Sequence, residues 1–489
     1  MNDRLRSFLK KASHYFLGNG LAILSGLISY PILTRVLDPS EYGTMGLISS
    51  VLLVSVAAGK LGIQNSIIRF HAEAKKEGRL AKLASTYMTA GLLMGGAAAA
   101  LQAAAALGFG AAGWIEGTFA GLVLLTAPLV LLRVQHSFGM SFLRAEERTR
   151  LYNVIDVVAR YLSLALALSL VFWFVGGVRG FFVGILLAEL IMATVVVFLT
   201  HRVTGFKPSK PQSKVIRQAL GFGLPLLAFE VTSIVLAFGD RVLIKALASD
   251  VALGHYTAAY NLGDTLQKFM VMPIALAIQP MYMRLWSEEG AEATASFLSR
   301  AGAVFFLLAI PSIAGVTAVR EPLILLLAGQ EYLEGASVLP LTFGGFMLYG
   351  GYTVSAAGLF LKKETHRMAG VVGGACVLNV VLNVALIPSW GIVGAAVATL
   401  ASYGVAIVAL TVLAFKHLRF DIPWAYLARV TVMSVVMWAS VFWIETGAVW
   451  STLLVRVLVG ALVMGVLALG VDRQGRRMLL QVLNQQRRQ

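Results

Sequence analysis

Ten charged side chains interrupt stretches of sequence that are otherwise apolar, and they are the residues best suited to chemistry in this chain. A charge in hydrocarbon is costly, so such residues usually face a protein interior or a wet cavity, where they bind ions or polar ligands. Given the 1.5 Å rise per helical residue, four of them lie roughly 13–20 Å from the nearest end of their stretch. These four are Glu189, Glu230, Asp264 and Lys268, and the other six are Lys60, Arg133, Asp156, Arg160, Arg429 and Arg456.

The same residues also allow a purely structural interpretation. Two carboxylates have a cation four residues further on, which permits an ion pair on one helix face. These pairs are Asp156 with Arg160 and Asp264 with Lys268. Long basic side chains near the end of an apolar stretch can extend their charge to the membrane surface. That is our expectation for Arg133, Arg429 and Arg456.

No catalytic or metal-binding motif accompanies these charges. The sequence has no G-x-x-x-x-G-K-[ST] loop, no G-x-S-x-G elbow, no H-E-x-x-H pair and no C-x-x-C pair. The single cysteine, Cys376, can form no disulfide within the chain. We therefore predict that the protein is not an enzyme, and we expect no catalytic residue, no cofactor and no metal.

The composition is that of an integral membrane protein. Of the 489 residues, 58% are hydrophobic and only 13% are charged, and the mean hydropathy is +0.80. Soluble domains are nearer half apolar and a quarter charged, so the excess apolar surface must face lipid. The net charge of +16 could suggest a nucleic-acid partner. The basic residues instead form short clusters between apolar stretches, which is typical of cytoplasmic loops, and we expect no nucleic acid.

Apolar segments of about 20 residues, the length that crosses a bilayer, predict fourteen transmembrane helices. They are 15–36, 43–66, 83–107, 115–136, 153–175, 180–200, 218–238, 253–280, 301–319, 337–361, 368–387, 391–415, 425–444 and 450–471. The uncharged stretch from Met368 to Phe415 is too long for one span, and we divide it at 387–391, where Pro388 and Gly391 indicate a turn.

The loop charges orient these spans. With fourteen helices, 29 of the 40 Lys and Arg residues fall on the side that holds both termini, and 5 fall on the opposite side. Because cytoplasmic loops carry the excess of basic residues, both termini are predicted to be cytoplasmic. The loops on the other side are short, which argues against a membrane polysaccharide polymerase with an active site there.

Four stretches of sequence resemble a known family. The first is Pro31–Gly43, which reads P-I-L-T-R-V-L-D-P-S-E-Y-G. The others are Leu61–Ile63 followed by Arg69–Phe70, then Gly239–Ile244 with Gly254–Asn261, and finally Asn379, Asn383, Ile387–Pro388 and Gly391–Thr399. Together they resemble the polysaccharide-transporter (Wzx-type) branch of the multidrug/oligosaccharidyl-lipid/polysaccharide (MOP) exporter superfamily. Each stretch also has a plain structural role, such as a turn at Pro39 and close helix packing through small residues at 391–399.

The resemblance implies an all-α fold of two pseudo-symmetric six-helix lobes around a central cavity, plus two C-terminal helices. On this basis residues 1–200 form the N-lobe, 201–217 a basic cytoplasmic linker, 218–415 the C-lobe, and 416–489 two additional helices and a basic tail.

The resemblance also implies a function. The family's substrate is an undecaprenyl-pyrophosphate-linked oligosaccharide repeat unit, which a flippase moves across the bacterial inner membrane by alternating access, for O-antigen, capsule or exopolysaccharide synthesis. Membrane lipids, a polymerase and other polysaccharide-assembly proteins are then the expected partners. Such cargo needs cations for its pyrophosphate, for which Lys60, Arg160, Arg241 and Lys268 are the candidates. Glu189, Glu230 and Asp264 are the candidates for coupling to an ion gradient. A lipid II flippase and a multidrug or cation antiporter of the same superfamily stay open as alternatives.

Overall fold

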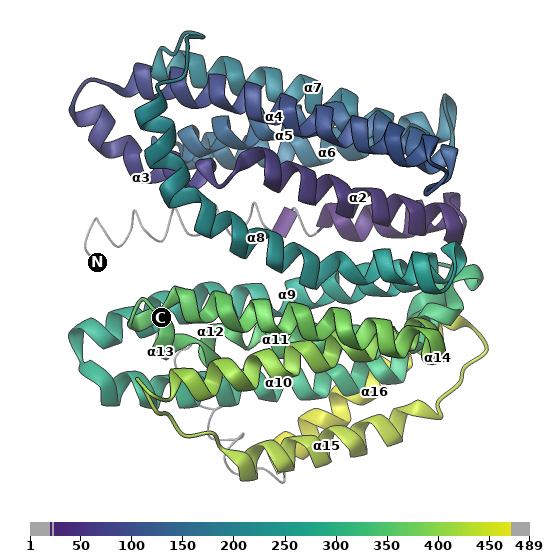
Figure 1. Cartoon of the computed structure of the whole chain (residues 1–489). Helices are drawn as coiled ribbons and strands as arrows, with labels where there is room; N and C mark the ends of the chain where they lie inside the picture. The colour runs from purple at the N-terminus through teal and green to yellow at the C-terminus, as the bar shows by residue number, and fades with distance from the viewer. Residues whose placement is uncertain (1–19, 22–23, 471–489) are drawn as a thin grey trace. The chain divides into compact units, whose positions relative to one another are not determined.

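The computed structural model describes residues 20–21 and 24–470, and the regular structure in these residues is entirely helical (Figure 1). The chain divides into two compact units, Met1–Val242 and Leu243–Gln489. The predicted span 15–36 lies partly outside the described residues, as do both termini, and its described part is helical from 24 to 36. The lobe boundaries predicted at 200 and 218 stay a prediction.

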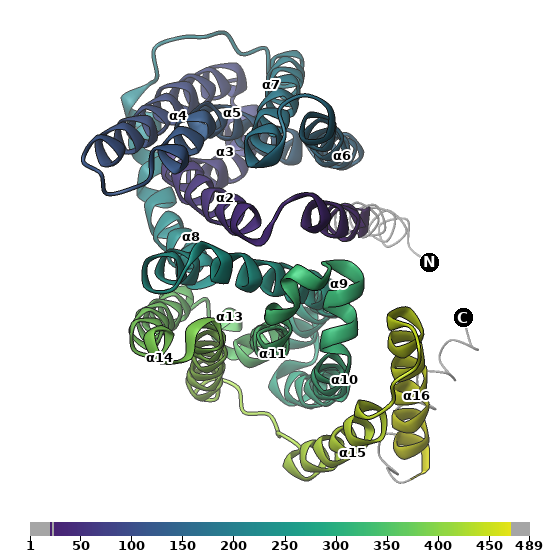
Figure 2. The same ribbon diagram turned by 90° about the vertical axis from the view of Figure 1, so that its right-hand side faces the viewer.

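The first unit consists of long helices joined by short turns. After the segment that ends at 36, it contains α2 (Pro39–Lys60), α3 (Ile63–Lys76), α4 (Leu80–Ala111), α5 (Gly117–Ala145), α6 (Thr149–Trp173), α7 (Gly177–Thr204) and most of α8 (Ser213–Leu247). Helix α5 packs against α4 and α7, and α7 also packs against α6, as Figures 1 and 2 both show.

The stretch that carries the first family-like motif folds into the start of α2. The Asp38 carboxylate accepts a hydrogen bond from the backbone N–H of Glu41 at 2.9 Å, and Pro39 occupies the first helical turn, where its missing N–H costs nothing. Helix α2 ends at Lys60 and is followed by Leu61 and Gly62, which both have left-handed backbone conformations (φ 47° and 74°). This turn separates α2 from α3 and sets their relative direction.

Glycines allow two close backbone approaches in the first unit. A Cβ atom on Gly62 would lie 2.1 Å from the carbonyl oxygen of Gly223 in α8, so this turn touches α8 backbone to backbone. A Cβ on Gly184 in α7 would lie 2.4 Å from the Cα of Ala167 in α6. Small residues at a crossing are the usual means by which membrane helices pack closely.

The second unit contains three long helices, one of them broken, together with a chain of short helices and a C-terminal hairpin. Its elements are α9 (Asp250–Glu288), α10 (Gly290–Leu327), the 3₁₀ helix η1 (Gln330–Ser337), α11 (Leu339–Gly350), α12 (Tyr352–Ser355), α13 (Ala357–Leu361), α14 (Thr365–Ala414), α15 (Trp424–Phe442) and α16 (Val449–Gly470). Helix α10 packs against α9, α11, α15 and α16, and α11 packs against α14. The predicted span 337–361 is thus a chain of three short helices.

The turn predicted near Pro388 is present as a break in α14. Gly391 has φ 55° and ψ −136°, values that no helix contains, so α14 is two helices that meet end to end. The buried Asn379 and Asn383 lie before this break, and the Nδ2 of Asn383 donates to the side-chain oxygen of Asn379 at 3.0 Å. This helix therefore accounts for both predicted spans between 368 and 415.

Length and composition identify a multi-pass membrane protein. Within the described residues, ten helices are long and apolar enough to cross a membrane. Many of their large apolar side chains are exposed, among them Leu101, Val408 and Leu462. Since such surface is stable only in lipid, the predicted class of all-helical integral membrane protein is confirmed.

Candidate functional site

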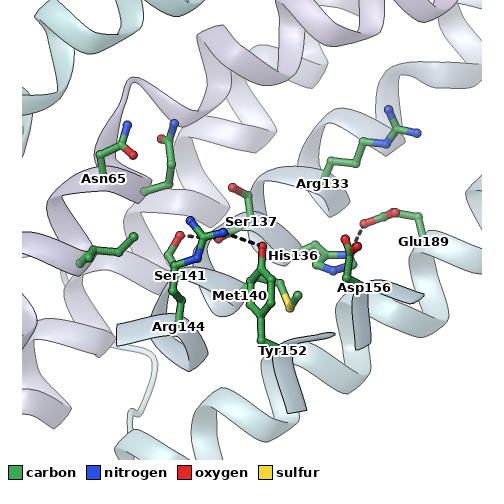
Figure 3. Close-up of a pocket in the computed structure, with 12 residues that line it drawn as sticks. Asn65, Arg133, His136, Ser137, Met140, Ser141, Arg144, Tyr152, Asp156 and Glu189 are labelled. Atoms are coloured by element: carbon green, nitrogen blue, oxygen red, sulfur yellow. Dashed lines mark hydrogen bonds and ion pairs between the residues drawn. The ribbon is translucent and has the colours of Figure 1, made fainter. Parts of the chain in front are cut away.

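A polar cavity of about 350 Å³ lies within the first unit, between α3, α5, α6 and α7 (Figure 3). Its lining residues are Gln64, Asn65, Ile68, Arg133, His136, Ser137, Met140, Ser141, Arg144, Tyr152, Asp156 and Glu189. All but two of these side chains carry a hydrogen-bonding group, although α5, α6 and α7 are otherwise largely apolar. A polar cavity among membrane-spanning helices is a site for a hydrophilic ligand.

Helix α5 supplies half of the lining. Its six lining residues follow one another at steps of three, one, three, one and three residues, from Arg133 to Arg144. That spacing places them on one face of an α-helix. The opposite side of α5 is apolar and buried, with Val134 and Phe138 in the core of the unit. The amphipathic pattern of α5 therefore builds one wall of the cavity.

Glu189 is held by a histidine rather than by an arginine. Its Oε1 lies 2.7 Å from Nδ1 of His136, and the two side chains are only 10% and 16% exposed. Arg133 lies one turn before His136 and is half-buried, and it has no hydrogen-bond or ion-pair partner in the described part of the chain. Figure 3 shows its guanidinium pointing away from the Glu189–His136 pair. In the described residues, two cations of the lining, Arg133 and Arg144, thus have no carboxylate within ion-pair distance. Arg144 donates to the hydroxyl of Tyr152 at 2.9 Å, whereas Arg133 has no such hydrogen bond.

Lys60 and Glu230, one a predicted phosphate cation and the other a predicted coupling carboxylate, bind each other. The Nζ of Lys60 at the end of α2 donates to Oε1 of Glu230 in α8 at 2.5 Å. Gln64, which lines the cavity, donates through Nε2 to the other oxygen of Glu230 at 3.1 Å. The side chains of Lys60 and Glu230 are 15% and 29% exposed. This three-residue cluster joins the α2–α3 turn to α8.

Arg241 lies deep in the first unit. It is 3% exposed, its Nη1 donates to the Oγ of Ser50 in α2 at 3.2 Å, and its guanidinium lies 4.6 Å from the ring centroid of Phe238. A guanidinium held in this way ties α8 to α2.

The remaining predicted site residues form ion pairs within one helix, as their spacing allows. Arg160 donates through Nε to Asp156 at 3.0 Å, and Lys268 donates to Asp264 at 2.6 Å. The cations are 50% and 57% exposed, and the carboxylates 34% and 33%. Asp156 also lines the cavity, whereas Asp264 and Lys268 belong to the second unit.

A second carboxylate–histidine contact lies just beyond the end of α5. Glu146 accepts hydrogen bonds from His71 at 2.9 Å and from Lys75 at 2.6 Å. Burial alone would raise the pKa of Glu146, but the hydrogen bond and charge of Lys75 and the contact with His71 together outweigh burial, so the pKa is lowered. The Glu146 carboxylate therefore stays ionised and links α3 to the α5–α6 turn.

Sequence reasoning missed the two central residues of the cavity. We expected Arg133 to reach the membrane surface, and His136 stood out only as one of seven scattered histidines. The signal that could have revealed them is the run of polar residues at helical spacing in α5. In the described residues, no three His, Cys, Asp or Glu side chains gather closely enough to hold a metal ion.

Solved structures with this fold are membrane transporters. A lipid II flippase, MurJ, in an inward closed conformation superimposes with a TM-score of 0.77 and 15% sequence identity, over 95% of this chain and 99% of that one. A multidrug resistance transporter of the MATE family in an inward-facing conformation gives a TM-score of 0.66 at 16% identity, over 81% of this chain and 93% of that one. The chain therefore shares the all-helical membrane fold of these two transporters, which confirms the predicted fold class.

The sequence identifies the family within that fold. The model of the polysaccharide biosynthesis protein family matches residues 8–286, which is more than half of the chain. The chain belongs to the polysaccharide biosynthesis protein family, and the resemblance inferred from its motifs is confirmed.

A curated relative comes from an archaeon. The chain is 24% identical over 341 residues to a probable low-salt glycan biosynthesis flippase, Agl15, of Haloferax volcanii, and the match covers 68% of this chain and 69% of the relative. The three proteins named here are transporters or flippases, in line with the prediction that the chain is not an enzyme.

Proposed function

We propose that the protein is a flippase that moves oligosaccharide units linked to polyprenyl pyrophosphate across the bacterial inner membrane, for the synthesis of a surface polysaccharide. The family supports a role in polysaccharide biosynthesis. The archaeal glycan biosynthesis flippase and the lipid II flippase of similar fold offer a precedent for the transport of lipid-linked glycans.

The observation that carries the proposal is the polar cavity with Arg133 in its wall. The headgroup of a lipid-linked oligosaccharide combines many hydroxyl groups with an anionic pyrophosphate. Serine, tyrosine and amide side chains of the cavity supply donors and acceptors for the sugar. The guanidinium of Arg133 can bind two phosphate oxygens at once, and no described carboxylate lies within ion-pair distance of it.

The other predicted cations differ in how readily they could serve the substrate. Lys60 would have to exchange Glu230 for a phosphate, and Arg160 would have to leave Asp156. Lys268 would have to leave Asp264, and Arg241 is almost fully buried. We therefore rank Arg133 first and retain these four as cations that could bind the phosphate in other conformations.

We propose the same kind of exchange for the coupling carboxylates. Glu189, Glu230 and Asp264 each hold a histidine or lysine partner. A carboxylate that gives up its partner while the cavity turns to the other side can accept a proton or a sodium ion instead. A carboxylate bound to its protein partner would thus favour one conformation of the helices, and a carboxylate bound to a proton or sodium ion would favour the other.

The test uses the purified protein in lipid vesicles that carry a fluorescent polyprenyl-pyrophosphate oligosaccharide. A charge-assisted hydrogen bond contributes about 1.5–3 kcal/mol, so Arg133→Gln should slow flipping roughly 10- to 150-fold. Arg133→Lys should keep part of the rate because the charge remains. The matched control is Arg217→Gln, an exposed arginine of α8 outside the cavity. Normal flipping by Arg133→Gln would remove the cavity from the mechanism.

A cation or drug antiporter is the second candidate, because two carboxylates, Asp156 and Glu189, also line the cavity. Anionic walls suit a cationic substrate. The same vesicles decide between the two, since an antiporter would exchange a lipophilic cation against an imposed proton or sodium gradient without a lipid-linked glycan. Lipid II offered in place of the oligosaccharide lipid tests the remaining alternative substrate.

A further inference from the structure

The second unit contains an apolar cavity of about 480 Å³ where α10, α12, the end of α14 and the start of α15 meet. Its lining residues include Phe305, Phe306, Val408, Val412, Phe415 and Phe420. Val408 and Val412 are 63% and 58% exposed although they belong to a membrane-spanning helix. An exposed valine on such a helix faces lipid, so the cavity opens toward the bilayer.

The connection between α14 and α15 closes one side of this cavity. Phe415 begins this connection and Phe420 lies within it, and their rings contact edge to face with the centroids 4.9 Å apart. Leu418 between them is buried in a core cluster that also includes the lining residue Val354. The Oγ of Ser299 in α10 donates to the backbone carbonyl of Asp421 at 2.6 Å, which fixes the connection to α10. These contacts fix the α14–α15 connection as one wall of the cavity.

Three exposed cations flank the apolar lining. Lys416 follows Phe415, Arg419 precedes Phe420, and Arg300 follows Ser299, so each is the sequence neighbour of a lining residue. None of the three has an ion-pair or hydrogen-bond partner for its side chain among residues 24–470. The one carboxylate among the lining residues is the exposed Asp421. An apolar cavity bordered by free positive charge matches an anionic lipid, whose acyl chain and headgroup need these two environments.

We propose that this cavity binds one acyl chain of an anionic phospholipid, with the phosphate of its headgroup against Arg300, Lys416 and Arg419. The predicted topology places these three cations on the cytoplasmic side, where the membrane surface is negatively charged. A lipid bound there would hold the α14–α15 connection against α10. Helix α10 is also the helix on which α15 and α16 of the C-terminal hairpin pack.

The size of the cavity favours a phospholipid over the polyprenyl tail of a transported lipid. A methylene group takes up about as much volume as a water molecule in the liquid, about 30 Å³. The 480 Å³ cavity therefore holds on the order of sixteen methylene groups, which is one ordinary acyl chain. A polyprenyl chain of eleven branched units is several times larger.

The experiment uses the full-length protein in nanodiscs and a phosphatidylglycerol probe with a photoreactive diazirine near the end of one acyl chain. After irradiation, label should appear on peptides that contain Val408, Val412 and Phe420. Val412→Trp fills the cavity and should remove most of that label. Val381→Trp is the matched control, since Val381 is also in α14 and is also 58% exposed but does not line the cavity. Val408→Phe occupies the same space if the first variant fails to fold.

The charge requirement is tested by replacing Arg300, Lys416 and Arg419 together with alanine. Each basic residue near an anionic membrane surface strengthens binding to anionic lipid roughly fivefold. Removing three should therefore raise the probe concentration for half-maximal labelling by about a hundredfold. The control removes the same charge from the α7–α8 connection and the start of α8, at the exposed Lys207, Lys210 and Lys214.

Three outcomes would overturn the proposal. The first is unchanged labelling in both cavity-filling variants. The second is that a phosphatidylcholine probe labels the protein as strongly as the phosphatidylglycerol probe does, and that the triple replacement leaves this labelling unchanged. That result would mean that the cavity accepts any acyl chain regardless of headgroup charge. The third is displacement of the probe by undecaprenyl phosphate at a lower concentration than by unlabelled phosphatidylglycerol, which would identify the cavity as a site for the transported lipid. None of these results depends on whether the protein flips glycans.

Discussion

Breaking the ion pair between Lys60 and Glu230 should destabilise the first unit by more than a surface salt bridge would. The pair connects the end of α2 to α8 at an N–O distance of 2.5 Å. The perturbations are Lys60→Met and Glu230→Gln, which keep the length of each side chain and remove its charge, together with the double variant. Glu230→Gln keeps a side-chain oxygen that can accept from Gln64.

The magnitude follows from the depth of the pair. Two unit charges 4 Å apart attract by about 4 kcal/mol at the effective dielectric constant of 20 that applies near a protein surface, before desolvation is subtracted. Removing one partner of a fully buried pair costs about 3–5 kcal/mol, and an exposed pair contributes about 1 kcal/mol or less. At 15% and 29% exposure this pair lies between those limits, so we expect a coupling free energy of about 1–3 kcal/mol.

The assay is a double-mutant cycle on the free energy of unfolding of the purified protein in detergent. Each single variant leaves one charge without its partner, so the double variant should be more stable than the sum of the two losses predicts. The pair formed by Asp156 and Arg160 is the internal control, because it is more exposed and lies within one helix. For such a pair the coupling is about 0.5 kcal/mol or less. A coupling between Lys60 and Glu230 as small as that of the control would refute the reasoning.

Three further results are expected. Glu146→Gln should lower the free energy of unfolding at neutral pH, because the pKa of Glu146 is lowered in the folded protein. This contribution is present above the pKa of a glutamate in the unfolded chain, about 4.3, and disappears as the pH falls through the folded pKa. The melting curves of the wild type and the variant should therefore converge in acid. Gly184→Ala should cost about 1–3 kcal/mol in detergent unfolding, because the new Cβ meets the α6 backbone, whereas Gly96→Ala, in open space, should be neutral or slightly stabilising; equal effects would contradict the close contact. Reporter fusions near Lys210 and after Gln489 should both give a cytoplasmic signal, and a periplasmic signal from either would break the fourteen-span topology.

The sequence predicts this fold well because membrane helices are specified mainly by local composition. Runs of apolar residues place the helices, and the turn signal at Pro388 and Gly391 locates the break in α14. The broken helix between Leu339 and Leu361 is the exception, since its apolar run continues across both breaks. Composition shows how apolar a segment is. A break in the backbone hydrogen bonds of a helix depends instead on the groups that pack beside it, which composition does not show.

In the candidate site, the sequence likewise predicts contacts between residues close in the chain but not contacts between distant ones. The ion pair of Asp264 and Lys268 follows from helical spacing alone. The partner of Lys60, Glu230, is 170 positions away in the sequence. Their contact depends on which faces of α2 and α8 meet, and the hydrophobic periodicity does not predict those faces because both helices are apolar nearly all round. The polar face of α5 could have drawn attention to His136, but its pairing with Glu189 depends on how α5 and α7 pack, which the sequence does not show.

The backbone contact between Gly62 and Gly223 has a consequence for how this sequence can drift over evolutionary time. On lipid-facing positions such as Val412, any apolar side chain of similar size fits, so neutral exchanges accumulate freely and sequence identity decays while the fold persists. At Gly62 and Gly223 no such freedom exists, because even one methyl group would collide with the other backbone. A deep mutational scan should therefore show two isolated positions of near-complete intolerance, 161 residues apart in the chain, surrounded by helices whose outer faces accept almost any apolar residue.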